Sequence, residues 1–170
     1  MDVGWIDRLL GRKQDEATAL YAAVVARGRE SHWYVAGGVA DSIDGRFDMI
    51  AAILSLVLLR LEAEPGAEAT GVALAERFVD DMDPQLREIG IGDVTVGKHI
   101  GRMMSMLGGR LGAYRAGLAS GSIDTALVRN LYRDHSPAPA ALTHVRDGLM
   151  TFNRALATTA FADLAAGRLP

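Results

Sequence analysis

Hydrophobic residues recur every three or four positions along most of the chain, which is the period of an amphipathic α-helix. No segment shows sustained alternation of apolar and polar residues, the pattern of a half-buried β-strand. The predicted helices, in chain order, cover residues 15–34, 47–61, 67–82, 83–90, 94–119, 123–135 and 140–166. The pattern therefore predicts an all-α fold, a single-domain bundle of six to seven helices.

The segment 47–61 is apolar on nearly every side, with the run MIAAILSLVLL at its centre. A helix needs roughly 20 apolar residues to span a bilayer, and this run is about half as long. We therefore expect a helix buried at the centre of the bundle. The start of the chain also lacks the pattern of a secretory signal, so a cytoplasmic protein is predicted.

Residues that favour turns or caps mark the predicted helix boundaries. In chain order these signals are Gly37-Gly38, the dipeptide Asp44-Gly45, the pair Asp83-Pro84, the expected N-caps Asp93 and Ser122, and the final glycine Gly167. Asp44-Gly45 is typical of a turn, and we expect it to precede the central helix. Asp83 followed by Pro84 is typical of an N-cap and first helical position, so a new short helix is expected there.

The first residues form a separate amphipathic segment, 1–13, ahead of the helical domain at 14–170. Its apolar residues are Trp5, Ile6, Leu9 and Leu10, and charged residues occupy the other side. Such a segment either docks on the domain or lies on a membrane surface. Both alternatives stay open at this level.

Small residues recur at four-residue intervals in the helix predicted at 94–119. One row is Gly97, Gly101, Ser105 and Gly109, and the other is Gly108, Gly112, Ala116 and Ser120. Each glycine costs a helix about 1 kcal/mol relative to alanine, so the rows need an offsetting contact. Close internal packing and a groove for a partner helix both supply one. Met103, Met104 and Met106 stand beside the rows and suit either interpretation.

Residue patterns for chemistry are sparse. The chain has no cysteine and a net charge of −3, which excludes thiolate sites and gives no footprint for nucleic acid. The carboxylates Asp80, Asp81, Asp83, Glu88 and Asp93 lack the spacing of a calcium loop, and His32, His99, His135 and His144 fall in no metal motif. The segment 90–99 resembles a phosphate loop but follows a helix and lacks the Ser or Thr after its lysine. We therefore expect no enzyme and no required cofactor.

Two segments, 34–48 and 78–114, resemble the ubiquinol–cytochrome c chaperone family. The matching residues of the first are Tyr34, Gly38-Val39, Asp41 and Gly45-Arg46-Phe47-Asp48. Those of the second are Phe78, Asp81-Met82-Asp83, Leu86-Arg87-Glu88, Gly90, Gly92-Asp93, Val96-Gly97-Lys98, Gly109-Arg110 and Tyr114. The similarity covers most of residues 15–135, and the compact length resembles a bacterial member.

The resemblance implies a non-enzymatic assembly factor for the cytochrome bc1 complex, with cytochrome b or a bc1 assembly intermediate as its partner. It also implies which residues contact that partner. These are Tyr34, Asp41, Arg46, Phe47, Asp48, Asp81, Asp83, Arg87, Glu88, Gly92, Asp93, Lys98, Arg110 and Tyr114. A location in the cytoplasm, at or near the inner membrane, follows from such a client.

Two other functions remain as alternatives. The first is a general helical scaffold or membrane-surface adaptor that acts through the segment 1–13 and an exposed apolar patch. The second is an enzyme or metal protein that uses the carboxylates between Asp80 and Asp93.

Overall fold

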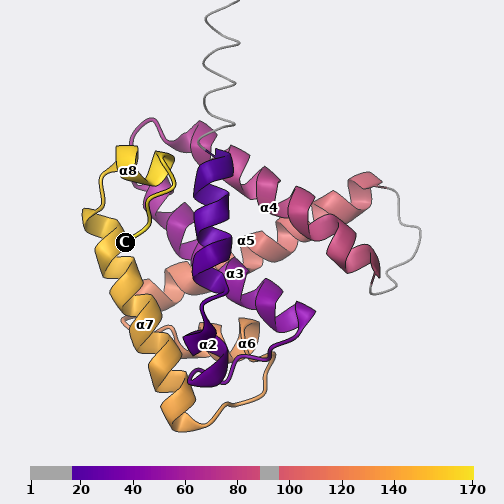
Figure 1. Ribbon diagram of the computed structural model, residues 1–170, viewed down its shortest axis with the longest axis vertical. Helices are drawn as coiled ribbons and strands as arrows, with labels where there is room; N and C mark the ends of the chain where they lie inside the picture. Colours follow the sequence, from indigo (N-terminus) through magenta and orange to yellow (C-terminus); the bar gives the residue numbers. More distant parts are fainter. Residues whose placement is uncertain (1–16, 89–95) are drawn as a thin grey trace, which may run out of the picture.

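The computed structural model describes residues 17–88 and 96–170, and the side chains of 83, 85–88, 96, 97 and 99 lie outside the description. These ranges contain helices and no strand, which confirms the all-α prediction (Figure 1). After a helical segment at 17–28, the elements are α2 (Ser31–Val35), α3 (Ile43–Glu62), α4 (Glu68–Glu88), α5 (Val96–Ser120), α6 (Asp124–Asn130), α7 (Pro139–Thr158) and α8 (Phe161–Ala165).

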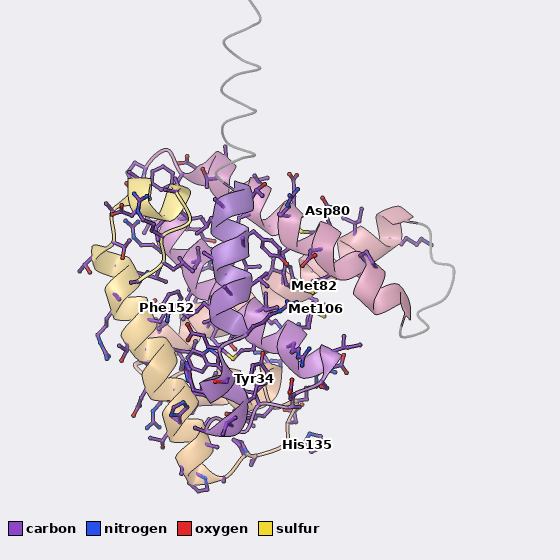
Figure 2. All side chains as sticks on the ribbon, viewed as in Figure 1. Tyr34, Asp80, Met82, Met106, His135 and Phe152 are labelled. Atoms are coloured by element: carbon purple, nitrogen blue, oxygen red, sulfur yellow. The ribbon has the colours of Figure 1, made fainter. Side chains whose placement is uncertain are left out.

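The central helix is α3, which contacts α4, α5 and α7. Every residue from Phe47 to Leu58 is buried, so the prediction of an all-round apolar core helix is confirmed. In Figure 1, α7 lies on one side of the molecule, and the C-terminal end of α4 and the N-terminal end of α5 project on the other. Met82 of α4 and Met106 of α5 lie where these two helices meet, whereas Asp80 is exposed on α4 (Figure 2).

The start of α3 differs from the sequence prediction. Asp44 and Gly45 lie in the first helical turn and do not form a separate turn. Ser42 is the N-cap, and its side-chain oxygen accepts a hydrogen bond from the Gly45 amide at 3.1 Å. Asp44 is favourable there because its charge faces the positive end of the helix. A Cβ on Gly45 would collide with the carbonyl oxygen of Ala40, so close packing of the preceding loop requires this glycine.

The predicted helix at 15–34 is divided into two pieces, because two aromatic side chains turn back onto the end of the first. The Trp33 indole N–H donates to the carbonyl of Arg27 at 2.8 Å, and the Tyr34 hydroxyl donates to that of Gly28 at 2.7 Å. These carbonyls belong to a helix end, where intrahelical partners are missing. The expected stop at Gly37-Gly38 is confirmed, with Gly38 at a φ of 62°.

No new helix begins at Asp83, because α4 continues to Glu88 with Pro84 inside it. A proline in a helix removes one N–H, and here that leaves the carbonyl of Asp80 without its usual partner. Asp80 is exposed, so water can bond this carbonyl and the helix tolerates the loss. The predicted cap at Asp93 lies outside the described residues, and α5 agrees with the predicted range 94–119.

The last third of the chain is more divided than its sequence pattern indicates. Ile123, rather than Ser122, stands at the N-cap of α6, and α6 ends at Asn130 instead of residue 135. Arg133 and Asp134 then adopt left-handed φ values of 51° and 63°, which no helix can contain.

The single helix predicted at 140–166 is in fact α7 and α8. Arg60 of α3 donates to the carbonyls of Leu156 and Thr159 at 3.0 and 3.1 Å, and so satisfies the end of α7 from outside the helix. Gly167 follows α8 with a φ of 75°, as the predicted terminal glycine should.

Replacing Gly45 with alanine should destabilise the protein by about 2–3 kcal/mol, because the new methyl group has no space beside Ala40. Gly109→Ala is the matched control, since it is a helical glycine with open space where the new methyl group would lie. The control should raise stability by up to about 1 kcal/mol. Urea unfolding of both variants measures the difference, and equal effects would contradict the steric explanation.

Candidate functional site

The two segments singled out in the sequence meet in the interior of the bundle. The rings of Phe47 on α3 and Phe78 on α4 lie 5.4 Å apart between centroids. The guanidinium of Arg110 on α5 lies 5.3 Å from the centre of the Phe47 ring, within range of a cation–π contact. Residues far apart in sequence therefore join α3, α4 and α5 at one point.

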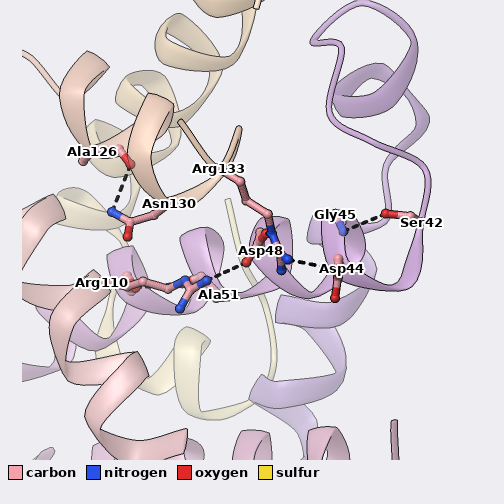
Figure 3. A network of polar contacts seen from close by, with 10 residues as sticks. Ser42, Asp44, Gly45, Asp48, Ala51, Arg110, Ala126, Asn130 and Arg133 are labelled. Atoms are coloured by element: carbon pink, nitrogen blue, oxygen red, sulfur yellow. Dashed lines mark hydrogen bonds and ion pairs between the residues drawn. The ribbon is translucent and has the colours of Figure 1, made fainter. Parts of the chain in front are cut away.

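Beside this aromatic contact, Asp48 is the centre of an ion network (Figure 3). Its side chain is fully buried, and its two oxygens each accept a hydrogen bond from a different arginine, Arg110 and Arg133, both at 2.6 Å. Arg133 also reaches Asp44 at 2.9 Å. The hydrogen bond to Asp48 raises the pKa of the Arg133 guanidinium. The network ties α3 to α5 and to the segment that follows α6.

Two buried tyrosines near this network differ in how their hydroxyl groups are satisfied. The Tyr132 hydroxyl donates to the carbonyl of Gly37 at 2.6 Å, and burial raises the pKa of Tyr132 to about 12. The Tyr114 hydroxyl has no hydrogen-bond partner within the described part of the chain, and burial raises its pKa further. An unpaired buried hydroxyl group costs stability, so the two hydroxyl groups contribute with opposite sign.

The residues predicted to contact a partner fall into three groups. Phe47, Asp48 and Tyr114 are buried, and Arg110 is largely covered. The others with described side chains reach the surface, and they are Tyr34, Asp41, Arg46, Asp81 and Lys98. Asp83, Arg87 and Glu88 have side chains outside the description, and Gly92 and Asp93 lie outside the described residues altogether.

Among the surface residues, most are paired within the chain. Asp41 and Arg46 form an exposed ion pair at 2.7 Å. The Tyr21 hydroxyl donates to Asp81 at 2.7 Å, and burial is the main reason that the pKa of Tyr21 is strongly raised. These side chains can present charge to a partner, whereas the buried group holds the helices together.

An apolar groove of about 420 Å³ opens between the end of α3, the first half of α4 and the middle of α5. Leu58, Leu61, Leu107 and Leu111 supply much of its apolar lining. Gly71 of α4 and Gly108 of α5 also line the groove, together with Ala67, Ala75, Glu62 and Glu68. Val72 and Met104 lie at the same place with 59% and 41% of their surface exposed.

Of the small-residue rows of α5, Gly108 lines this groove. At Gly101, Gly108, Gly109 and Gly112, no heavy atom of the described structure lies within 4 Å of the position that a Cβ would take. Close internal packing is therefore the wrong interpretation for these four glycines. Of the three neighbouring methionines, Met103 is buried, Met106 is half-buried and Met104 is exposed.

Sequence reasoning found the α5 side of the groove and missed the α3 and α4 side. The available signal was Val72, which interrupts the polar face of α4 close to Gly71 and Ala75. Exposed Glu68 places an acidic side chain at the edge of the groove, whereas Glu62, which also lines it, is paired with Arg115 at 2.7 and 2.9 Å.

The described residues offer little support for other kinds of site. Within 17–88 and 96–170, no three His, Asp or Glu side chains converge in a way that could hold a metal ion. No helix in the same ranges has both the length and the apolar character that a membrane crossing requires.

Comparison with known proteins agrees with the family resemblance of the two sequence motifs. The model of the ubiquinol–cytochrome c chaperone family matches residues 35–169. The chain belongs to this family. A solved structure, that of the Cbp3 homolog from Brucella abortus, is similar over 99% of this chain and 95% of that one, with 29% identity and a TM-score of 0.85. A search of curated proteins returns no match.

Family membership confirms the resemblance that the motifs at 34–48 and 78–114 indicated. It also favours a role in binding over a role in catalysis, since the family is one of chaperones. The matched range includes α3, α4 and α5 and therefore contains both the Asp48 network and the whole groove.

Replacing Asp48 with asparagine should destabilise the protein by about 3–5 kcal/mol, because two arginines would lose the buried charge that they share. Asp41→Asn is the control, since it breaks an exposed pair worth about 0–1 kcal/mol. Chemical unfolding of both variants measures the difference. A cost for Asp48→Asn no larger than for the control would contradict the structural role.

Replacing Tyr114 with phenylalanine should leave stability unchanged or raise it by about 1 kcal/mol, because it removes a buried hydroxyl that lacks a partner. Tyr132→Phe should instead cost about 1 kcal/mol, since its hydroxyl is bonded to Gly37. Thermal unfolding of the two variants compares them directly. A clear loss on Tyr114→Phe would show that this hydroxyl is satisfied after all.

Proposed function

We propose that this protein is an assembly chaperone of the ubiquinol–cytochrome c reductase (bc1) complex and that it binds cytochrome b before the complex is complete. The family description and the similarity to the Cbp3 homolog support the general role. The protein acts by binding its client, without catalysis and without a cofactor of its own.

The observation that carries this proposal is the open apolar groove between α3, α4 and α5. An unassembled membrane subunit has helix faces that are normally covered by lipid or by other subunits, and a chaperone must cover them. An apolar groove receives one face of a helix in the common helix-in-groove mode. Gly71 and Gly108 let a partner backbone approach closely, and Met104 adapts its shape to different apolar side chains.

Charge at the edge of the groove favours the end of a membrane helix as the bound segment. The cytoplasmic ends of membrane helices carry an excess of Lys and Arg. Glu68 is exposed beside the apolar lining. The apolar part of such a helix would therefore contact the groove lining, and its basic end would lie near Glu68.

The exposed residues of the motifs at 34–48 and 78–114 have a second role in the proposal. Arg46 and Lys98 carry exposed positive charge, and we propose that they orient a partner after the groove has engaged it. The same role is proposed for Asp41 and Asp81. Because such a client enters the inner membrane, the protein would act in the cytoplasm or at the membrane surface.

Photocrosslinking in cells tests the identity of the client. A photoreactive residue at position 72 or 104 should capture cytochrome b, because both positions lie at the groove. Position 35 is the control, since Val35 is 85% exposed but lies on α2, away from the groove lining. Recovery of no cytochrome b from 72 and 104, or equal recovery from 35, would contradict the proposal.

Replacing Val72 or Met104 with aspartate should lower co-purification of cytochrome b about tenfold or more, because burying a charge in an apolar groove easily exceeds about 1.4 kcal/mol. Val35→Asp is the matched control and should leave binding unchanged. Circular dichroism of each variant must show native helix content and an unchanged Tm. Full binding by both groove variants would place the client elsewhere on the surface.

A further inference from the structure

Three polar side chains form a hydrogen-bonded chain that links α2 to α7. Glu30 precedes α2, and its Oε2 lies 3.0 Å from Nε2 of His32. The other ring nitrogen of His32, Nδ1, lies 2.9 Å from Nε2 of His144 on α7. Both histidines are half-buried and line a cavity of about 600 Å³, as do Trp33 and Phe152.

While both histidines are neutral, the Glu30 carboxylate fixes which ring nitrogens carry hydrogen. Glu30 can only accept, so Nε2 of His32 carries a hydrogen and donates it. A neutral His32 then has a lone pair on Nδ1, which must accept from the partner ring. Nε2 of His144 is therefore the donor, and the free lone pair of the whole chain is on Nδ1 of His144.

Successive protons then have opposite effects on the contact. The first binds Nδ1 of His144, and the positive charge then lies on whichever ring holds the hydrogen between them. The hydrogen bond becomes charge-assisted and stronger in either case. The second can bind only the remaining nitrogen between the two rings. That would set two N–H groups and two positive charges against each other across 2.9 Å, and the contact must open.

The charged groups around the two rings are themselves paired. Arg27 is paired with Glu30 at 3.2 Å, and Asp147, one helical turn after His144, is paired with Arg146 at 3.1 Å. Asp147 and Pro170 line the same cavity as the histidines. Two imidazoles alone do not make a metal site, and the described residues bring no third ligand to them.

The hydrogen bond between His32 and His144 lies beside the packing that holds α2 against α7. A Cβ on Gly148 of α7 would lie 2.9 Å from the Trp33 ring, so this glycine lets α7 approach the indole closely. His144 lies one helical turn before Gly148 on α7, and its ring centroid is 6.4 Å from that of Trp33. Beyond Trp33 the chain continues into Tyr34 and the loop that leads to α3.

We propose that Glu30, His32 and His144 form a proton-operated clip between α2 and α7, which one proton strengthens and a second proton opens. Opening would loosen the segment that carries Tyr34 and Asp41 while the core around α3 stays folded. Histidine is the side chain that ordinarily changes charge between about pH 5 and 8, so the clip is tested across that range.

NMR of the ring nitrogens in the full-length protein tests the proton positions without any substitution. Near pH 8, His32 should carry its hydrogen on Nε2 and His144 on Nε2. On acidification the pair of rings should take up its two protons in two separate steps, the second only at a clearly lower pH. A hydrogen on Nδ1 of His32 at pH 8, or uptake of both protons in a single step, would overturn the proposal.

Amide hydrogen exchange tests whether the clip stabilises the C-terminal end of α2. The amides of Ala36 and Gly37 both donate to the carbonyl of His32, so they report on the end of α2. Their exchange, corrected for intrinsic rate, should accelerate about tenfold or more when the second proton binds, whereas that of Ile53 in α3 should not change.

A pair of matched variants separates the clip from general acid effects. His144→Leu should show the faster exchange of Ala36 and Gly37 already at neutral pH. His135→Leu is the control, because His135 is exposed on the connection between α6 and α7 (Figure 2). Unchanged exchange in His144→Leu, or the same change in both variants, would refute the clip.

Discussion

The buried carboxylate of Asp48 is the interaction on which the arrangement of the helices depends. A lone charge of this kind is too costly to bury, so the fold must bring cations to it. Arg110 and Arg133 meet this requirement from α5 and from the segment after α6. Three elements far apart in sequence are thereby fixed relative to one another. The consecutive left-handed residues Arg133 and Asp134 show that the chain accepts local strain where this guanidinium is delivered.

The groove and the ion network use different faces of α5. Met103, Arg110 and Tyr114 face the core, whereas Met104, Gly108 and Leu111 line the opening, and buried Leu107 lies between the two sets at the base of the groove. A helix with a firmly held inner face can keep an apolar outer face exposed without rearranging to cover it. This division explains how glycines that cost helix stability are retained in α5. Their cost is offset by the core face, and the outer face remains open to a partner.

The helices of the core could be predicted from sequence, because their signals are local. The all-round apolar run at 47–61 and the period of α5 needed no knowledge of neighbours. The failures occurred where a distant residue decides the local structure. Ala40 and Ser42 convert Asp44-Gly45 from a turn into a helix start, and Arg60 helps to end α7 at residue 158. The site was predicted only in part, since a groove built from three helices has no signature in any one of them.

The burial of Phe47, Asp48 and Tyr114 also changes how functional experiments on this family should be interpreted. All three belong to the motifs by which the family is identified, yet none reaches the surface here. A substitution at Asp48 that abolishes client binding would act through the positions of α3 and α5, since no client can touch this side chain while the fold is intact. Exposed residues such as Val72 and Met104 are different, because their loss leaves the core unchanged. Binding assays therefore identify contact residues only when stability is measured on the same variants.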